Sequence, residues 1–149
     1  MIRTGRRLTL CVCLLVVNLA FIWGNSLLPG EASGALSRWV KELITALLGL
    51  TSTGEGGHGL LRKLAHFTEF CTLGMCLSWL FGMLLKKPFF PAWGAGFLAA
   101  CIDETIQLFV PGRGLGIKDV GIDTAGVLVG LVFIILINKR KLKLEDKTL

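Results

Sequence analysis

The sequence predicts an all-α integral membrane protein with four transmembrane helices. Hydrophobic residues make up 53% of the 149 residues and charged residues only 17%, whereas soluble domains carry about 25% charged residues. The hydrophobic residues are concentrated in four runs, each close to the roughly 20 residues that a helix needs to cross a bilayer. Because a backbone in hydrocarbon must satisfy its own hydrogen bonds, helix is the expected state of each run.

The first predicted span covers about residues 8–28 and follows a basic N-terminus. The other three cover about 64–85, 91–110 and 120–137, and Pro91 suits a first helical turn because its missing N–H needs no partner there. A cleaved signal peptide is the alternative for the first run, but the run is longer than the usual signal core of about 7–15 residues. The whole chain is predicted to form one domain.

A more polar helix is predicted between the first two spans, at about residues 34–50. Its apolar side chains recur at helical spacing, with charged side chains between them. Such a helix is too polar to span, so we expect it to lie in the outer membrane interface, with Ser33 as its N-cap. A loop is predicted over residues 51–59, where His58 would be solvated.

The distribution of Lys and Arg predicts that both termini are cytoplasmic. With the N-terminus inside, ten of the 16 Lys and Arg residues fall on the inner side and six on the outer side, as the positive-inside rule favours. The inner ten are Arg3, Arg6, Arg7, Lys86, Lys87, Lys139, Arg140, Lys141, Lys143 and Lys147, and the outer six are Arg38, Lys41, Arg62, Lys63, Arg113 and Lys118.

Several functional classes are disfavoured. The net charge of +6 sits in clusters between apolar runs, which is typical of membrane topology and not of nucleic-acid binding. The five cysteines all fall in predicted spans without a C-x-x-C spacing, so we interpret them as packing residues. No G-x-S-x-G, H-E-x-x-H or P-loop motif occurs, which argues against the standard hydrolases, zinc proteases and nucleotide-binding proteins.

Polar and ionisable residues gather near the outer ends of the predicted spans. His66 and Glu69 are three residues apart and share a helix face, as do Asp103 and Gln107, which are four apart. The full set comprises Lys63, His66 and Glu69 of the second span, Asp103, Glu104 and Gln107 of the third, Arg113 of the following connection, and Asp119 and Asp123 at the start of the fourth.

The cost of these groups in a membrane predicts that they face inward. A lone Asp at the centre of a span costs roughly 2.5–3.5 kcal/mol on insertion scales. Ionisable residues inside a membrane are therefore by default a functional-site hypothesis. Small residues share their faces: Gly96 and Ala100 precede Asp103, and Gly126 and Gly130 follow Asp123 in a G-x-x-x-G pattern. Such stripes let helix backbones approach closely, so we expect helix contacts around an outward-opening pocket.

Three segments resemble the motifs of the VanZ-like membrane protein family. Residues 62–70, RKLAHFTEF, resemble the motif of its second helix. Residues 103–113, DETIQLFVPGR, and 118–126, KDVGIDTAG, resemble the signature that follows. Ser26, Pro29, Glu31 and Ser33 resemble the polar end of its first helix, and the resemblance extends over about residues 21–132. Ile106 stands where many relatives carry His, so a mechanism that needs that histidine is not expected here.

The resemblance implies a role in the bacterial cell envelope, in the cytoplasmic membrane. The member that gives the family its name is associated with low-level resistance to the glycopeptide teicoplanin. A membrane lipid, a lipid-linked envelope precursor and the glycopeptide itself are therefore the candidate ligands, and no nucleic-acid partner is expected. The resemblance supplies no mechanism, and the oligomeric state stays open.

Two classes of function remain open. In the first, the site binds or processes a lipid or lipid-linked glycan. Lys63 and Arg113 would hold a phosphate or carboxylate, and His66, Glu69, Asp103 and Glu104 would be the catalytic candidates. Further ligand-binding residues would be Ser26, Gln107, Asp119 and Asp123.

In the second class, the protein is a non-catalytic accessory whose charged cluster is a structural salt-bridge network or a partner interface. No cofactor is expected in either class. A variant of the first class places Mg²⁺ or another hard cation on Asp103, Glu104, Asp119 and Asp123, although their spacing is not a recognised metal motif.

Overall fold

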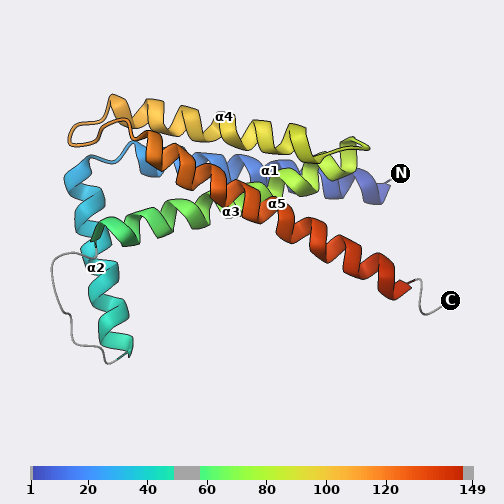
Figure 1. The fold of residues 1–149 in the computed structure, drawn as a ribbon, viewed down its shortest axis with the longest axis horizontal. Coiled ribbons are helices and arrows are strands. Elements are labelled where there is room, and N and C mark those ends of the chain that lie inside the picture. Colours follow the sequence, from blue (N-terminus) through green and yellow to red (C-terminus); the bar gives the residue numbers. More distant parts are fainter. Residues whose placement is uncertain (1, 49–57, 146–149) are drawn as a thin grey trace.

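The computed structural model describes residues 2–48 and 58–145, which form five α-helices (Figure 1). These described ranges contain no strand, so the all-α prediction is confirmed. The helices are α1 (Ile2–Ser26), α2 (Gly30–Leu48), α3 (His58–Leu84), α4 (Phe89–Leu108) and α5 (Ile117–Glu145).

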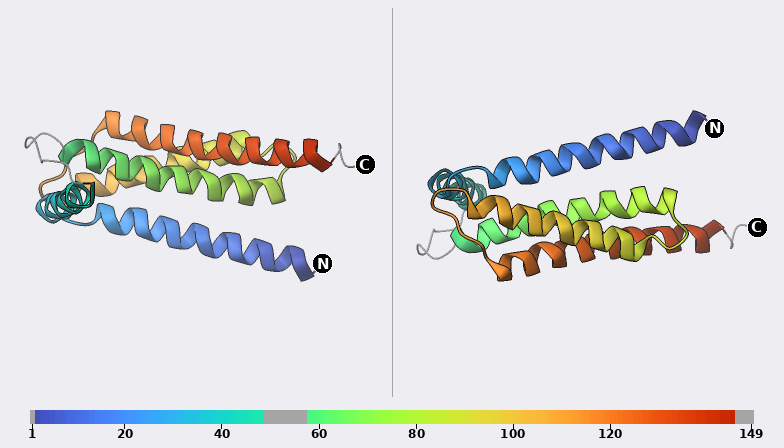
Figure 2. Two further views of the ribbon diagram at one scale, coloured as in Figure 1. Left: turned by 90° about the horizontal axis from the view of Figure 1, so that it is seen from below. Right: turned by 90° about the horizontal axis from the view of Figure 1, so that it is seen from above.

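Four of the helices, α1, α3, α4 and α5, form an antiparallel bundle with the start of α1 and the end of α5 at the same end (Figures 1 and 2). The turn between α3 and α4, which carries Lys86 and Lys87, lies at that end too. The connection between α4 and α5, which carries Arg113, lies at the opposite end. There α2 runs crosswise to the bundle and projects past it in Figure 1, and it is viewed nearly end-on in Figure 2.

Three helices in the described part of the chain are long and apolar enough to cross a membrane, not four. They are the segments Gly5–Ser26 of α1, Leu60–Leu84 of α3 and Ile117–Arg140 of α5. The prediction of a fourth span at 91–110 is wrong by this criterion, because Asp103, Glu104 and Gln107 lower the hydropathy of α4. Those three side chains are buried against the other helices, and α4 also contributes Ala92, Ala99 and Ala100 to the apolar core, so α4 belongs to the bundle although it does not meet the criterion for a span.

The amphipathic helix that we predicted over residues 34–50 is present as α2, but it begins at Gly30. The N–H of Ser33 donates a hydrogen bond to the Pro29 carbonyl at 3.0 Å, so Ser33 lies inside the helix and the prediction that it is the N-cap is wrong. Pro29 immediately precedes the first helical residue, where its missing N–H needs no helical partner. Most of the predicted loop at 51–59 lies outside the described residues, and His58 is the first residue of α3.

Glycines bring α5 directly against the backbone of α3, as the G-x-x-x-G pattern predicted. Gly126 faces the carbonyl of Phe67, and Gly130 faces the carbonyl of Cys71 one turn further along α3. A side chain at either position would collide with that backbone. Close approach of this kind maximises dispersion contacts, which drive helix association where lipid tails remove the hydrophobic driving force.

A core of buried apolar residues joins the helices, while many large apolar side chains point outward. Ile22, Phe70, Leu73, Val127 and Leu131 are almost fully buried. In contrast, Val16, Val17 and Phe21 on α1 are each 58–67% exposed, as expected of residues that contact lipid.

An apolar cavity of about 290 Å³ lies between α1, α3 and α4. We call it the apolar groove. It is lined by Leu15, Leu19, Trp23, Leu73, Leu77, Leu80, Phe81, Ala95, Leu98, Ala99 and Ile102.

Candidate functional site

The end of the bundle that lies opposite the chain termini gathers the polar residues that the sequence singled out. We call this set the polar cluster. Ser26 ends α1, His66 and Glu69 lie in the first part of α3, Asp103, Glu104 and Gln107 lie in the last part of α4, Arg113 lies in the connection that follows, and Asp119 and Asp123 lie in the first part of α5. The antiparallel order of the helices places these segments at one depth.

Asp103 is fully buried and ties α1 to α4. The Ser26 hydroxyl donates a hydrogen bond to Asp103 Oδ1 at 2.6 Å, and Gln107 Nε2 donates one to Asp103 Oδ2 at 2.7 Å. Gln107 Nε2 also donates to the Ser26 oxygen at 3.3 Å. Since buried carboxylates need such donors, these bonds explain how Asp103 is accommodated between the helices.

Asn25, near the C-terminal end of α1, is hydrogen-bonded to both Glu69 and Arg113. The Asn25 amide donates to Glu69 Oε1 at 3.0 Å, and Arg113 Nη2 donates to the Asn25 carbonyl at 3.2 Å. The Nε and Nη1 atoms of Arg113 are buried and have no hydrogen-bond partner. Burial and the nearby Arg62 lower the pKa of the Arg113 guanidinium below its usual value, although an Arg side chain stays charged. Arg113 therefore carries a positive charge and has two nitrogen atoms whose N–H groups have no acceptor.

The connection between α4 and α5 is fixed by backbone contacts. Glu104 Oε2 accepts a hydrogen bond from the N–H of Gly116 at 2.7 Å. The N–H of Gly30 donates to the Pro111 carbonyl at 3.1 Å, and Gly112 adopts a φ of 74° that an L side chain rarely allows. These contacts hold the connection against the start of α2 and so set the position of Arg113.

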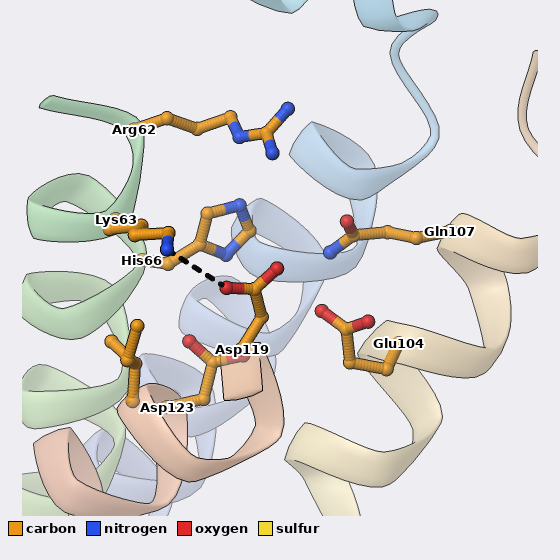
Figure 3. A pocket seen from close by; sticks show the side chains of 8 residues that line it. Arg62, Lys63, His66, Glu104, Gln107, Asp119 and Asp123 are labelled. Carbon is orange, nitrogen blue, oxygen red and sulfur yellow. Dashed lines mark ion pairs between the residues drawn. The ribbon is translucent and has the colours of Figure 1, made fainter. Parts of the chain in front are cut away.

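A small pocket opens into the polar cluster (Figure 3). Its volume of about 10 Å³ suits a single water molecule or ion. Lys63 points toward Asp119, with 3.9 Å between Nζ and Oδ1. The lining residues are Arg62, Lys63, His66, Glu104, Gln107, Asp119, Ile122 and Asp123.

Three groups in the cluster lie close enough to share a metal ion. His66, Asp103 and Asp123 each offer one ligand atom within 4.8 Å of the others. Among the described residues this is the group that meets that spacing, and it differs from the four carboxylates considered from sequence. Glu104 instead accepts the Gly116 N–H, and Asp119 faces Lys63.

Two contributors were not assigned from sequence. Arg62 lines the pocket, and it lies one helical turn before His66, so its spacing could have placed it on the same face. Asn25 carries the contacts to Glu69 and Arg113, and its position beside Ser26 was the available signal. Lys63 lies at the edge of the site, with 46% of its side chain exposed.

A family model described as VanZ/LLP1 matches residues 8–138 of the chain. Comparison with curated proteins and with solved structures finds no match. Since the matched region includes most of the chain and the whole polar cluster, the protein belongs to the VanZ/LLP1 family. The resemblance found in its motifs is thereby confirmed.

Proposed function

We propose that this member of the VanZ/LLP1 family binds an anionic lipid or lipid-linked precursor of the envelope at the outer leaflet of the bacterial cytoplasmic membrane. The observation that carries the proposal is that the polar cluster and the apolar groove lie end to end. Trp23, Leu73 and Ala99 of the groove each stand one helical turn, about 5.4 Å, from a residue of the polar cluster. An amphiphilic molecule fits such a pair of surfaces.

The head group would rest at the mouth of the polar pocket. A pocket of about 10 Å³ admits a water or an ion but not a phosphate with its substituents. Arg113 has two buried donor atoms without acceptors, and a guanidinium matches the spacing of phosphate oxygens. Arg62 lines the pocket itself, which Arg113 does not, and adds a second positive charge.

The hydrocarbon chain would occupy the apolar groove. At about 290 Å³ the groove is comparable to the smaller ligand pockets of proteins, so it holds part of one chain while the remainder lies among the bilayer lipids. The groove runs from the polar cluster toward the end of the bundle with the chain termini, which is the direction a chain takes from a head group in the outer leaflet.

Orientation follows from charge. With the termini cytoplasmic, the polar cluster faces the outside, and α2 lies in the outer interface with Trp39 and Leu43 available to lipid. A reporter protein fused to either terminus should be active only if it is of a type that works in the cytoplasm. A reporter that works outside the cell at either terminus would overturn this orientation.

The alternative of a purely structural salt-bridge network is less well supported by the contacts. Among the polar cluster and the residues that line the pocket, one pair of opposite formal charges is in contact: Lys63 and Asp119, at 3.9 Å. A network that fixes helix register should satisfy its buried members, yet Asp123 and Arg113 each keep two unpartnered buried atoms. If the bound head group is also processed, His66, Glu69, Asp103 and Glu104 are the candidates for proton transfer.

Head-group binding can be measured with spin-labelled lipids around the full chain in lipid nanodiscs. We expect phosphatidic acid to associate more strongly than phosphatidylcholine, and Arg113→Gln to lose most of that preference. The loss should be about tenfold, as is typical when one ionic hydrogen-bonded contact is removed. Lys118→Gln, which removes an exposed positive charge at the same end, is the matched control. Equal effects of the two substitutions would show that the preference for phosphatidic acid arises from general surface charge.

The apolar groove is tested separately in the same assay. Ala95→Phe places a ring in the groove, whereas Val17→Phe places one on an exposed face of α1. Only Ala95→Phe should reduce the fraction of immobilised lipid. No difference between the two variants would contradict the assignment of the groove to a lipid chain.

We further propose that the site contributes to teicoplanin resistance. Expression in a susceptible bacterium should raise the inhibitory concentration of teicoplanin, and His66→Ala, Glu69→Gln and Asp103→Asn should each abolish the rise while still accumulating in the membrane. Failure of all three to accumulate would favour the structural network. Normal accumulation with full resistance would show that the pocket has no part in it.

A further inference from the structure

Side chains from three helices converge beneath the pocket with unused ligand capacity. His66 comes from α3, Asp103 from α4 and Asp123 from α5, and their ligand atoms lie within 4.8 Å of one another. The His66 Nδ1 atom is 3.8 Å from Asp103 Oδ2, which is too long for a hydrogen bond. The three groups therefore face each other without bonding to each other.

We infer that His66, Asp103 and Asp123 form a binding site for a divalent transition-metal ion, and that Zn²⁺ is the ion their donor atoms fit best. This site goes beyond the proposed lipid function and does not depend on it. It also differs from the hard-cation site considered from sequence, because it includes an imidazole and excludes Glu104 and Asp119.

Asp123 is the strongest independent indication. Its side chain is 1% exposed and lines the pocket, and neither carboxylate oxygen has a hydrogen-bond partner. Leaving a buried polar group unsatisfied costs about 1–3 kcal/mol, and more for a charged group. The Nδ1 atom of His66 is likewise buried and unpartnered. A cation between them would satisfy both groups at once.

Asp103 already has the supporting contacts of a metal ligand. Ser26 occupies its Oδ1 atom and Gln107 donates to Oδ2, so the carboxylate is held in place while Oδ2 retains a second lone pair. Metal-binding carboxylates are usually oriented by hydrogen bonds of this kind. Bonds of about 2.0–2.2 Å to Zn²⁺ require the ligand atoms to draw closer together than their present spacing, which small rotations of Asp123 and His66 can supply.

The types of ligand atom indicate which metal ion fits best. Mg²⁺ and Ca²⁺ prefer all-oxygen sites, whereas imidazole favours Zn²⁺ and related transition metals. Zinc sites with three protein ligands keep a fourth position open for water or substrate. The pocket of about 10 Å³ borders His66 and Asp123 and has room for that fourth ligand.

The test uses the full chain purified in detergent micelles, stripped with a chelator, loaded with Zn²⁺ and desalted before metal analysis. We expect one Zn²⁺ per chain, a higher thermal midpoint with the metal, and a Co²⁺ absorption spectrum that reports nitrogen and oxygen ligands. Asp123→Asn should weaken Zn²⁺ binding at least about tenfold. Asp119→Asn, which alters a carboxylate lining the same pocket, should change it less than about threefold because that charge is partly exposed.

Folding is separated from binding by the stripped protein. Because neither Asp123 oxygen has a partner, Asp123→Asn should keep or raise the thermal midpoint without metal and lose the increase with Zn²⁺. His66→Gln provides a second variant with the same expectation for the increase. The inference is overturned if the wild type retains no Zn²⁺, or if Asp119→Asn weakens binding as much as Asp123→Asn, which would indicate diffuse attraction to acidic residues.

Discussion

The two sides of α3 differ in how closely they are packed. Toward α5, glycines 126 and 130 lie against backbone carbonyls of α3, so no side chain separates the helices. Toward α1 and α4, α3 presents Leu73, Leu77 and Phe81, and a groove of about 290 Å³ remains. Both sides are apolar, so hydrophobicity alone does not distinguish them.

Small residues allow α3 and α5 to pack closely, whereas polar contacts at one end of α1 help to hold it against α3 and α4. Over much of its length α1 exposes its apolar side chains. The side-chain hydrogen bonds of Asn25 to Glu69 and of Ser26 to Asp103 are short, at 3.0 and 2.6 Å, whereas those of Cys11 to the Cys76 carbonyl and of Trp23 to the Ala99 carbonyl are longer, at 3.6 and 3.5 Å. Since lipid tails compete equally well for apolar surface, a helix with large side chains needs such polar contacts to stay in place. The arrangement leaves the apolar groove beside α1, while a second apolar hollow of about 330 Å³ lies on the surface of α5.

The largest expected effect comes from filling the close interface. Gly130→Val would drive its side chain into the Cys71 carbonyl, and backbone cannot yield as a side chain does. We expect a loss of about 1–3 kcal/mol or more in the free energy of unfolding, measured as a lower thermal midpoint in detergent. Gly121→Val makes the same change in the same helix where nothing lies within 4 Å. Equal destabilisation by both would mean that helix propensity, and not the contact, is responsible.

A smaller effect is expected at the polar contacts of α1. Ser26→Ala removes a donor to the buried Asp103 carboxylate and should cost about 1–2 kcal/mol. With the other cysteines replaced by alanine, the buried Cys11 should also react faster with a maleimide, because α1 separates from the bundle. Thr9→Ala, which removes an exposed hydroxyl bonded within α1, should change neither measurement. Unchanged Cys11 reactivity in Ser26→Ala would show that apolar packing alone holds α1.

The smallest effect is expected at the edge of the site. Lys63 and Asp119 are 3.9 Å apart, and their side chains are 46% and 34% exposed. Lys63→Gln should therefore change the free energy of unfolding by less than about 0.5 kcal/mol, and salt should reduce this change further because it screens exposed charges. A drop as large as that of Ser26→Ala would instead support the structural salt-bridge network.

Much of the candidate site could be predicted from single-helix spacing. His66 with Glu69, and Asp103 with Gln107, share a face because they are three or four residues apart, and the short connection keeps Arg113 nearby. Which groups pair across helices could not be predicted, because that depends on helix rotation. Asp123 was expected to meet other carboxylates or cations, yet it faces His66 and Asp103 without a hydrogen bond.

The sequence by itself determined the helical state, the antiparallel order and the glycine stripe of α5, since these depend on hydropathy, connection length and helical periodicity. The sequence overestimated the ability of α4 to span the membrane. The buried acids of α4 are satisfied by hydrogen bonds: Ser26 of α1 and Gln107 of α4 itself donate to Asp103, and the Gly116 N–H donates to Glu104. The tertiary structure alone decided the groove and the triad of His66, Asp103 and Asp123. Both arise from the distances and rotations between helices, which are set by side-chain contacts far apart in the chain.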